Sequence, residues 1–195
     1  MSLIERININ KNTVDKLESE ILFQRHIERY ALARKYLYGQ VCDVACGVGY
    51  GAYLCAKNPD VTKISGFDAD KDAVVHAQEH FTTNRTQFEC KAVESIEGKF
   101  DILMSLETIE HLKDPRELVS LAKRCQVNEI LLSFPNKKTT HYNKWHLWDI
   151  TSHDIKALFK EYYVLDEFDF YDSKFMHLVK GRPQAKILVK SWSAS

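Results

Sequence analysis

The sequence has little of what marks several specialised protein classes. Its 195 residues include 27 Lys and Arg against 27 Asp and Glu, so the formal net charge is zero. Zero net charge argues against a generally basic surface for nucleic acid, although it leaves a local basic patch open. Apolar runs are only a few residues long, whereas a membrane span needs roughly 20. The first residues lack the apolar core of a secretory signal. We therefore expect a cytoplasmic protein without a membrane span.

The cysteines form no recognisable framework. There are five, an odd number, and no two are spaced as CxxC: Cys42, Cys46, Cys55, Cys90 and Cys125. This pattern argues against a set of disulfides or a structural zinc site. We expect reduced, partly buried thiols.

Apolar and β-branched residues instead predict alternating helices and strands. Expected strands cover residues 41–45, 63–67, 87–91, 100–105, 129–134, 163–171 and 185–191. Expected helices cover 16–38 (as one or two), 50–56, 71–81, 115–124 and 152–161. This alternation predicts an α/β fold with a parallel sheet between helices, whose ligand lies at the carboxyl ends of the strands. The length suits a single domain over 1–195, with a helical segment at 1–38 and the α/β core at 39–195.

A glycine loop follows the first expected strand. Gly47, Gly49 and Ala52 fit the GxGxxA pattern of dinucleotide sites, where glycines let a ligand approach the backbone. Asp43, near the end of the strand, argues against a dinucleotide because a carboxylate repels pyrophosphate. It suits a cationic group, such as the amino group of a methionine moiety. A tight turn without a ligand is the alternative interpretation.

A second carboxylate, Asp68, follows the next apolar strand about 20 residues beyond the glycines, where acidic residues accept hydrogen bonds from ribose. Asp70 competes for this role. We favour Asp68 because it follows the apolar run directly.

In order and spacing, the segments DVACGVGYG, GFDAD and SLETIEHLKDP resemble the class I methyltransferases that use S-adenosylmethionine (SAM). The chain is most similar to small bacterial enzymes of the type 11/23 group, often linked to sugar or polysaccharide biosynthesis. The likeness includes HIERY upstream and FPN and KWHLWDIT downstream, and covers roughly residues 25–170. It implies a Rossmann-like, mostly parallel seven-stranded sheet with helices on both faces and an antiparallel last strand.

The resemblance also implies a SAM site. Asp43, Gly47 and Gly49 would hold the methionine part, Asp68 the ribose and Ala69 the adenine side. Leu106 would line the methionine side, and Arg29 or Tyr30 would close over the cofactor. The full expected cofactor set is Asp43, Ala45, Gly47, Gly49, Tyr50, Asp68, Ala69, Ala92, Val93 and Leu106. Two features depart from the family: Ala92 stands where relatives have an acidic adenine contact, and residues 125–128 lack a glycine-rich turn.

Glu110 and His111 are the expected catalytic residues, because they follow the fourth strand where an acceptor would meet the methyl group. The pKa of a free imidazole, about 6.5, suits His111 as a general base. A structural histidine that bonds the loop is the other interpretation. Glu107, Glu110 and His111, with His141 or His146, could also hold a divalent ion, as in RNA 3′-end 2′-O-methyltransferases. The predicted site nevertheless assigns no metal.

The aromatic segment after residue 136 predicts an acceptor pocket formed by Tyr142, Trp145 and His146, since aromatic faces and polar edges suit sugars. Trp148 is instead expected to anchor the loop. The resulting hypothesis is methyl transfer to a small polar acceptor, specifically a hydroxyl of a sugar, nucleotide-sugar or glycan end. The alternatives are a metal-dependent RNA 2′-O-methyltransferase, a non-catalytic SAM-binding domain and, more distantly, a nicotinamide dehydrogenase. The sequence does not fix O, N or C methylation or the oligomeric state.

Overall fold

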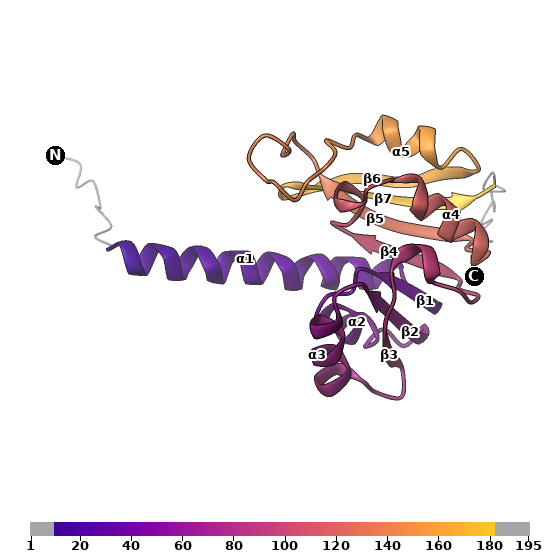
Figure 1. Ribbon diagram of the computed structural model, residues 1–195, viewed down its shortest axis with the longest axis horizontal. Coiled ribbons are helices and arrows are strands. Elements are labelled where there is room, and N and C mark those ends of the chain that lie inside the picture. The colour runs from indigo at the N-terminus through magenta and orange to yellow at the C-terminus, as the bar shows by residue number, and fades with distance from the viewer. Residues whose placement is uncertain (1–9, 182–195) are drawn as a thin grey trace, which may run out of the picture.

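The computed structural model describes residues 10–181, in which helices and strands alternate (Figure 1). The elements are α1 (Lys11–Ala33), η1 (Arg34–Tyr36), β1 (Gly39–Val44), α2 (Tyr50–Cys55), β2 (Val61–Asp68), α3 (Lys71–Phe81), β3 (Thr86–Cys90), η2 (Val93–Ser95), β4 (Ile102–Leu106), η3 (Ile109–His111), α4 (Arg116–Arg124), β5 (Glu129–Pro135), α5 (Ser152–Leu158), β6 (Tyr162–Phe170) and β7 (Ser173–Lys180). None of the helices in this described part is long and apolar enough to cross a membrane.

The seven strands form one sheet in the order β3-β2-β1-β4-β5-β7-β6. Parallel pairing joins the first five strands of this order, and β7 runs antiparallel to both β5 and β6. The expected Rossmann-like sheet with an antiparallel last strand is therefore confirmed. The chain order reverses between β1 and β4, which places a ligand crevice at the carboxyl ends of these strands.

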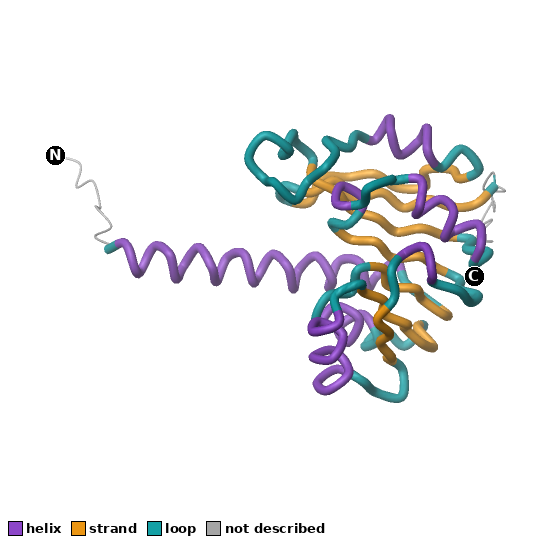
Figure 2. Tube along the Cα trace, in the orientation of Figure 1, coloured by secondary structure: helices purple, strands orange, loops and turns teal. Residues whose placement is uncertain are grey.

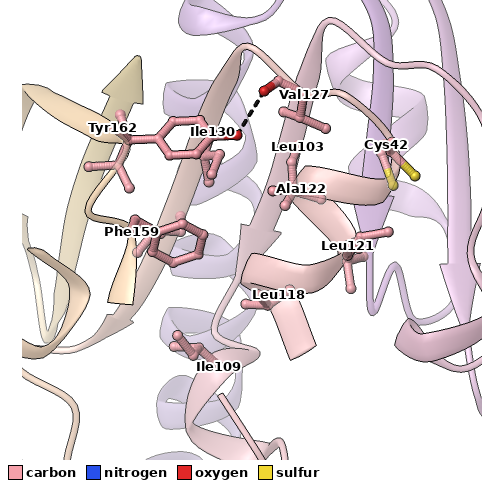
Figure 3. Packing of buried hydrophobic residues seen from close by; sticks show 14 of the residues in the cluster. Cys42, Leu103, Ile109, Leu118, Leu121, Ala122, Val127, Ile130, Phe159 and Tyr162 are labelled. Atoms are coloured by element: carbon pink, nitrogen blue, oxygen red, sulfur yellow. Dashed lines mark hydrogen bonds between the residues drawn. The ribbon is translucent and has the colours of Figure 1, made fainter. Parts of the chain in front are cut away.

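Helices cover both faces of the sheet (Figure 2). On one face, α4 and α5 pack on residues such as Leu103, Ile130 and Leu132, part of the core seen in Figure 3. On the other face, α2, α3 and the end of α1 pack on residues such as Met104 and Leu131. Leu103 and Met104 are neighbours in the sequence but point to opposite faces, as strand geometry requires. Apolar runs such as Ile130 to Leu132 therefore mark strands covered on both faces.

The N-terminal helix differs from the sequence prediction. It is a single helix that begins at Lys11, capped by Asn10, whose side chain accepts a hydrogen bond from the Thr13 amide. Its first half extends away from the sheet (Figure 1), whereas Tyr30 and Ala33 near its end are buried against the core. The cap moves the start of the helix five residues earlier than the apolar periodicity indicated.

The end of the sheet also differs. The strand expected at 185–191 lies outside the described residues, and the last described strand is β7, which the sequence pattern did not identify. Polar residues such as Lys174 and His177 interrupt its apolar pattern, although its interior positions are largely buried. A tight turn with Tyr171 at φ 55° joins it to β6. Pairing with β5 and β6, not local hydrophobicity, therefore defines this strand.

The core contains one buried hydrogen bond that can be tested alone. The Tyr162 hydroxyl donates to the Val127 carbonyl at 2.7 Å (Figure 3). Replacing Tyr162 by Phe leaves this carbonyl without that donor, so we expect a loss of about 1–2 kcal/mol in the free energy of unfolding. Urea unfolding measures it, with Tyr163→Phe on the neighbouring exposed side chain as the control. Equal stability of Tyr162→Phe and wild type would contradict this assignment.

Candidate cofactor and acceptor site

The loop after β1 adopts left-handed backbone at three positions: Ala45 (φ 58°), Gly47 (φ 54°) and Gly49 (φ 88°). A Cβ on Gly49 would lie 2.6 Å from the Cβ of Ala77, so this glycine permits close packing on α3. A Cβ on Gly47 would meet no atom within 4 Å. The backbone at Gly47 is therefore open to a ligand, as the glycine pattern predicts.

Asp68 fixes the shape of this loop. Its Oδ2 accepts a hydrogen bond from the Gly47 amide at 2.8 Å, and its Oδ1 accepts one from the Asp70 amide at 2.9 Å. Asp70 caps α3 by accepting from the amides of Asp72 and Ala73. Both residues line the cavity described below, so the cap gives Asp70 a structural role without removing it from the site. Asp68, at the end of β2, stays our candidate for the ribose.

Asp43 lies within β1 and is almost fully buried. No side chain or backbone group hydrogen-bonds to its Oδ2. Burial raises the pKa of Asp43 to about 8, and the negative charge of Asp68 contributes to the shift. A buried carboxylate without a counter-charge is costly and would be stabilised by a cationic ligand group.

A cavity of about 860 Å³ lies beside this loop. Seven of the predicted site residues line it: Ala45, Asp68, Ala69, Ala92, Val93, His111 and Trp145. The other predicted residues are not among its lining residues: Asp43, Gly47, Gly49, Tyr50, Leu106, Glu110, Tyr142 and His146. The first five of these lie in β1, in the glycine loop, at the start of α2 or at the end of β4.

The adenine end of the expected site contains an acidic residue that the sequence analysis missed. Ala92 and Val93 line the cavity as expected, and so does Glu94, two residues beyond the position where relatives carry an acid. A carboxylate is therefore present near this end despite Ala92. The sequence pattern did not show that an acid two residues after the expected position, in the η2 turn, lines the cavity.

Glu107 is a second residue that was not included in the predicted site. It directly follows β4, has φ 49° and lines the cavity. Its Oε1 accepts a hydrogen bond from the Ser133 hydroxyl at 2.6 Å, and its amide donates to the Ser133 carbonyl at 3.0 Å. The guanidinium of Arg29 approaches the same carboxylate, with Nε 4.0 Å from Oε1. A non-glycine residue held in this conformation at a strand end is a frequent feature of functional sites.

Glu110, His111 and His146 form a cluster, and one ligand atom from each lies within 4.8 Å of the others. Glu110 is fully buried, and neither carboxylate oxygen has a hydrogen-bond partner. Burial raises the pKa of Glu110 to about 8, and the charge of Glu107 adds to this effect. Burial also lowers the pKa of His146, with the neighbouring His111 as the next cause. His111 and Glu110, predicted from the sequence as a pair, thus meet a third residue from a distant loop.

The loop after β5 is fastened to the turn that contains the cluster. The Leu147 amide donates to the Glu110 carbonyl at 2.8 Å, and Trp148 Nε1 donates to the Leu112 carbonyl at 2.8 Å. Trp148 therefore anchors the loop, in line with the sequence interpretation. Trp145 is exposed and lines the cavity, whereas Tyr142 is exposed and stacks edge-on against His141 instead. The structure brings Trp145 and His146 to the site but does not place Tyr142 among the residues that line the cavity.

Comparison with known proteins identifies residues 41–127, slightly less than half of the chain, as a match to a family model described as a methyltransferase domain. The mitochondrial ubiquinone biosynthesis O-methyltransferase of Saccharomyces cerevisiae is 33% identical over 84 residues. These residues are 40% of this chain, and the match spans about a quarter (27%) of that relative's length.

Solved structures support the fold over a larger share of the chain. Magnesium protoporphyrin IX methyltransferase from Synechocystis PCC 6803, with bound SAH, has a TM-score of 0.69 and 19% identity, and 90% of each chain is covered. The [4+2]-cyclase SpnF has a TM-score of 0.65 and 14% identity, with 80% of this chain and 81% of that chain covered. The second structure shows that the fold by itself does not fix the reaction.

The two loop glycines should respond differently to alanine. Gly49→Ala strains a left-handed backbone and places a methyl group against Ala77, so we expect a loss of about 2–4 kcal/mol of stability. Gly47→Ala meets no neighbour and should cost about 1 kcal/mol, from the backbone alone. Urea unfolding of both variants gives these values. Equal losses would show that the loop does not pack as described.

The pKa of Asp43 predicts how stability depends on pH. A carboxyl whose folded pKa is raised from 3.8 to about 8 stabilises the fold below pH 3.8, and this contribution is lost progressively as pH rises through 8. Glu110 acts with the same sign, since its pKa rises from 4.5 to about 8. Without ligand, stability should therefore fall between about pH 5 and pH 8 from these two groups.

Asp43→Asn should make this decline shallower, by up to about 1.4 kcal/mol per pH unit, and should be more stable than wild type at pH 8. Urea unfolding of the ligand-free protein at pH 5.5, 7 and 8.5 measures the slope. Asp166→Asn, on an exposed strand position, is the control. An unchanged slope in Asp43→Asn would contradict the assignment.

Proposed function

We propose that this chain, which carries a methyltransferase domain and has the class I SAM-dependent methyltransferase fold, transfers the methyl group of SAM to an oxygen of a small acceptor. The observation that carries the proposal is Asp43: a buried carboxylate with an unpartnered oxygen, next to a loop whose Gly47 is open to a ligand. The methionine part of SAM supplies an ammonium group that would balance this charge. Asp68 would accept hydrogen bonds from the ribose, and Ala69, Ala92 and Val93 would line the adenine.

The acceptor is assigned to the end of the cavity lined by Glu107, His111 and Trp145. Methyl transfer needs the acceptor atom close to the sulfonium and in line with the breaking bond. It also benefits from loss of the acceptor's proton, which we assign to the cluster of Glu110, His111 and His146. His111 is the member of this cluster that lines the cavity, which supports its role.

The acceptor class is inferred from the aromatic ring that lines the cavity. The exposed ring of Trp145 at the cavity suits the face of a sugar, so a hydroxyl of a sugar, nucleotide-sugar or glycan end stays our prediction. The two methyltransferase relatives act, by their names, in magnesium protoporphyrin and ubiquinone metabolism, and neither name includes a sugar. A small hydroxylated aromatic compound is therefore the competing acceptor. The meeting of Glu110, His111 and His146 fits the metal that the RNA alternative requires, but nothing in the described residues singles out RNA as the acceptor. The acid at Glu94 weakens the case for a non-catalytic domain, which rested on Ala92.

The first experiment is ligand binding. SAM and S-adenosylhomocysteine should each raise the melting temperature, whereas NADH should not, because binding to the folded state stabilises it. Asp43→Asn should weaken SAM binding at least about tenfold in calorimetry, since it removes the partner of the ammonium group. Asp60→Asn, at an exposed position that is not among the residues lining the cavity, should bind SAM like wild type.

The second experiment measures transfer of a labelled methyl group to a panel of nucleotide sugars and hydroxylated aromatic compounds. His111→Asn should lower the rate by about 100-fold or more while SAM affinity stays within about twofold. Failure to bind SAM would refute the proposed function. Binding without transfer to any member of the panel would support a non-catalytic domain.

A further inference from the structure

The first half of α1 is exposed along its whole length. Every residue from Lys11 to Leu22 is exposed, and only the end of the helix is buried against the core, at Tyr30 and Ala33. This half extends away from the sheet (Figure 1). A helical segment of about 12 residues is marginally stable in water by itself, because most helices depend on packing of an apolar face. A further surface that packs on this half would therefore stabilise it.

One side of the exposed half is apolar. A shallow groove of about 400 Å³ runs along it, lined only by residues of α1: Val14, Leu17, Glu18, Ile21, Leu22 and Arg25. These positions recur at intervals of three and four residues, which places them on one side of the helix. The four apolar side chains among them are 42–51% exposed. Such a row of exposed apolar side chains marks an interaction surface, called here the α1 face.

The charges of α1 favour a protein over a lipid surface as the partner. The helix carries four Lys and Arg residues against four Asp and Glu residues, so its net charge is zero. Helices that lie on membranes are instead rich in Lys and Arg, which anionic lipids attract. The α1 face contains one charge of each sign, Glu18 and Arg25. Glu18 lies three residues before Ile21 and Arg25 three residues after Leu22, so the charges of the face are symmetric about its centre.

We propose that the α1 face binds the same face of a second copy of this chain, with the two helices antiparallel about a two-fold axis between Ile21 and Leu22. This axis sets Ile21 against Leu22 of the partner subunit and Glu18 against Arg25 of the partner subunit. Because a two-fold interface uses the same patch on both copies, the ion pair forms twice. The result is an apolar centre between charged ends, as is usual in protein interfaces.

The antiparallel direction follows from charge and from space. In a parallel pair each residue would face its own copy, so Glu18 would meet Glu18 of the partner subunit and Arg25 would meet Arg25 of the partner subunit. A parallel pair would also bring both sheets to the same end of the helices, since the sheet lies at one end of α1 (Figure 1). The antiparallel pair places the two sheets at opposite ends and sets the helix dipoles in opposite directions.

The inner end of the α1 face is oriented by the rest of the chain. Arg25 lies over the Tyr171 ring, with its Cζ 5.0 Å from the ring centroid. The Tyr171 hydroxyl donates to Glu28 Oε2 at 2.7 Å, which holds this ring against α1. An arginine stacked on an aromatic ring still presents N–H donors at the edge of its guanidinium. Arg25 is therefore positioned before association, which reduces the entropy lost when the ion pair forms.

Sedimentation of the full chain between about 1 and 300 µM tests the proposal. The α1 face runs from Val14 to Arg25, about 18 Å of helix, so the interface is small and we expect a dissociation constant of roughly 1–100 µM. Ile21→Glu places a charge beside the axis and should weaken association more than about 30-fold. Phe23→Glu is the matched control, because Phe23 is 75% exposed on the same helix but points about 200° away from Ile21. It should dimerise like wild type.

An exchange of charges tests the register. Glu18→Arg and Arg25→Glu each set like charges against each other at both ends of the interface, so each variant alone should associate at least about tenfold more weakly than wild type. An equimolar mixture of the two variants again opposes unlike charges at both ends. This mixture should form a heterodimer with a dissociation constant within about threefold of the wild type. The melting temperature of each variant shows whether it is folded.

A chain that stays monomeric over the whole range would overturn the proposal, and so would a dimer that Ile21→Glu leaves intact. A mixture of the charge variants that associates no better than either variant alone would overturn the proposed register. Co-sedimentation with vesicles of phosphatidylcholine and phosphatidylglycerol tests the other occupant. Vesicle binding by a monomeric chain, abolished by Ile21→Glu, would assign the α1 face to a lipid surface instead.

Discussion

A carboxylate buried at the end of the first strand is the constraint around which this structure is arranged. Asp43 lies in the middle of a seven-stranded sheet, between β2 and β4, and one of its oxygens has no partner. Burial raises the pKa of Asp43 to about 8, so this carboxyl group is largely protonated at pH 7 in the absence of a ligand. Proteins tolerate such a group where a ligand completes it. The glycine loop, Asp68 and the cavity are the surroundings that allow a ligand to do so.

Two buried carboxyl groups near the cavity, Asp43 and Glu110, have oxygens without a hydrogen-bond partner. Asp43, in β1, has an oxygen without a hydrogen-bond partner, and we propose that the ammonium group of SAM pairs with it. Glu110, in the turn after β4, has two oxygens without a hydrogen-bond partner and lies beside two histidines whose Nδ1 atoms are already bonded. The topology brings these two side chains to the same region, because β1 and β4 are adjacent parallel strands whose C-terminal ends face the same crevice. Each of these buried carboxyl groups lowers the stability of the fold, and such a loss of stability is common at functional sites.

Much of the fold was predictable from local pattern. The apolar runs of β1, β4 and β5 indicated strands, the run of β5 one covered on both faces, and Pro115 marked the start of α4. The strand β7 was not predictable, because its place between β5 and β6 depends on pairing with residues far away in the sequence. The start of α1 was misplaced for a different reason, since the Asn10 cap lies before the apolar periodicity begins.

The sequence predicted which residues line the cavity where a polar residue lies at or just after a strand end, as with Asp68 and His111. Glu107 was named only as a residue that could hold a divalent ion and was left out of the predicted site, because a left-handed backbone at a strand end leaves no pattern in the sequence. Tyr142 was included because the aromatic loop was treated as one unit. The fold instead places Trp145 along the cavity and His146 beside Glu110 and His111, and Tyr142 is not among the lining residues. The meeting of Glu110, His111 and His146 required the loop after β5 to return to the turn after β4. Only tertiary structure provides that information.

Proton release on cofactor binding tests the central claim most directly. Asp43, with a pKa of about 8, is largely protonated at pH 7 and should ionise when an ammonium group arrives. Calorimetry of SAM binding at pH 7, in buffers of different ionisation enthalpy, should show release of nearly one proton per chain. S-adenosylhomocysteine should give the same result because it retains the amino group, whereas 5′-methylthioadenosine, which lacks that group, should release none. Binding of SAM without any proton release, or equal release with all three compounds, would contradict the account.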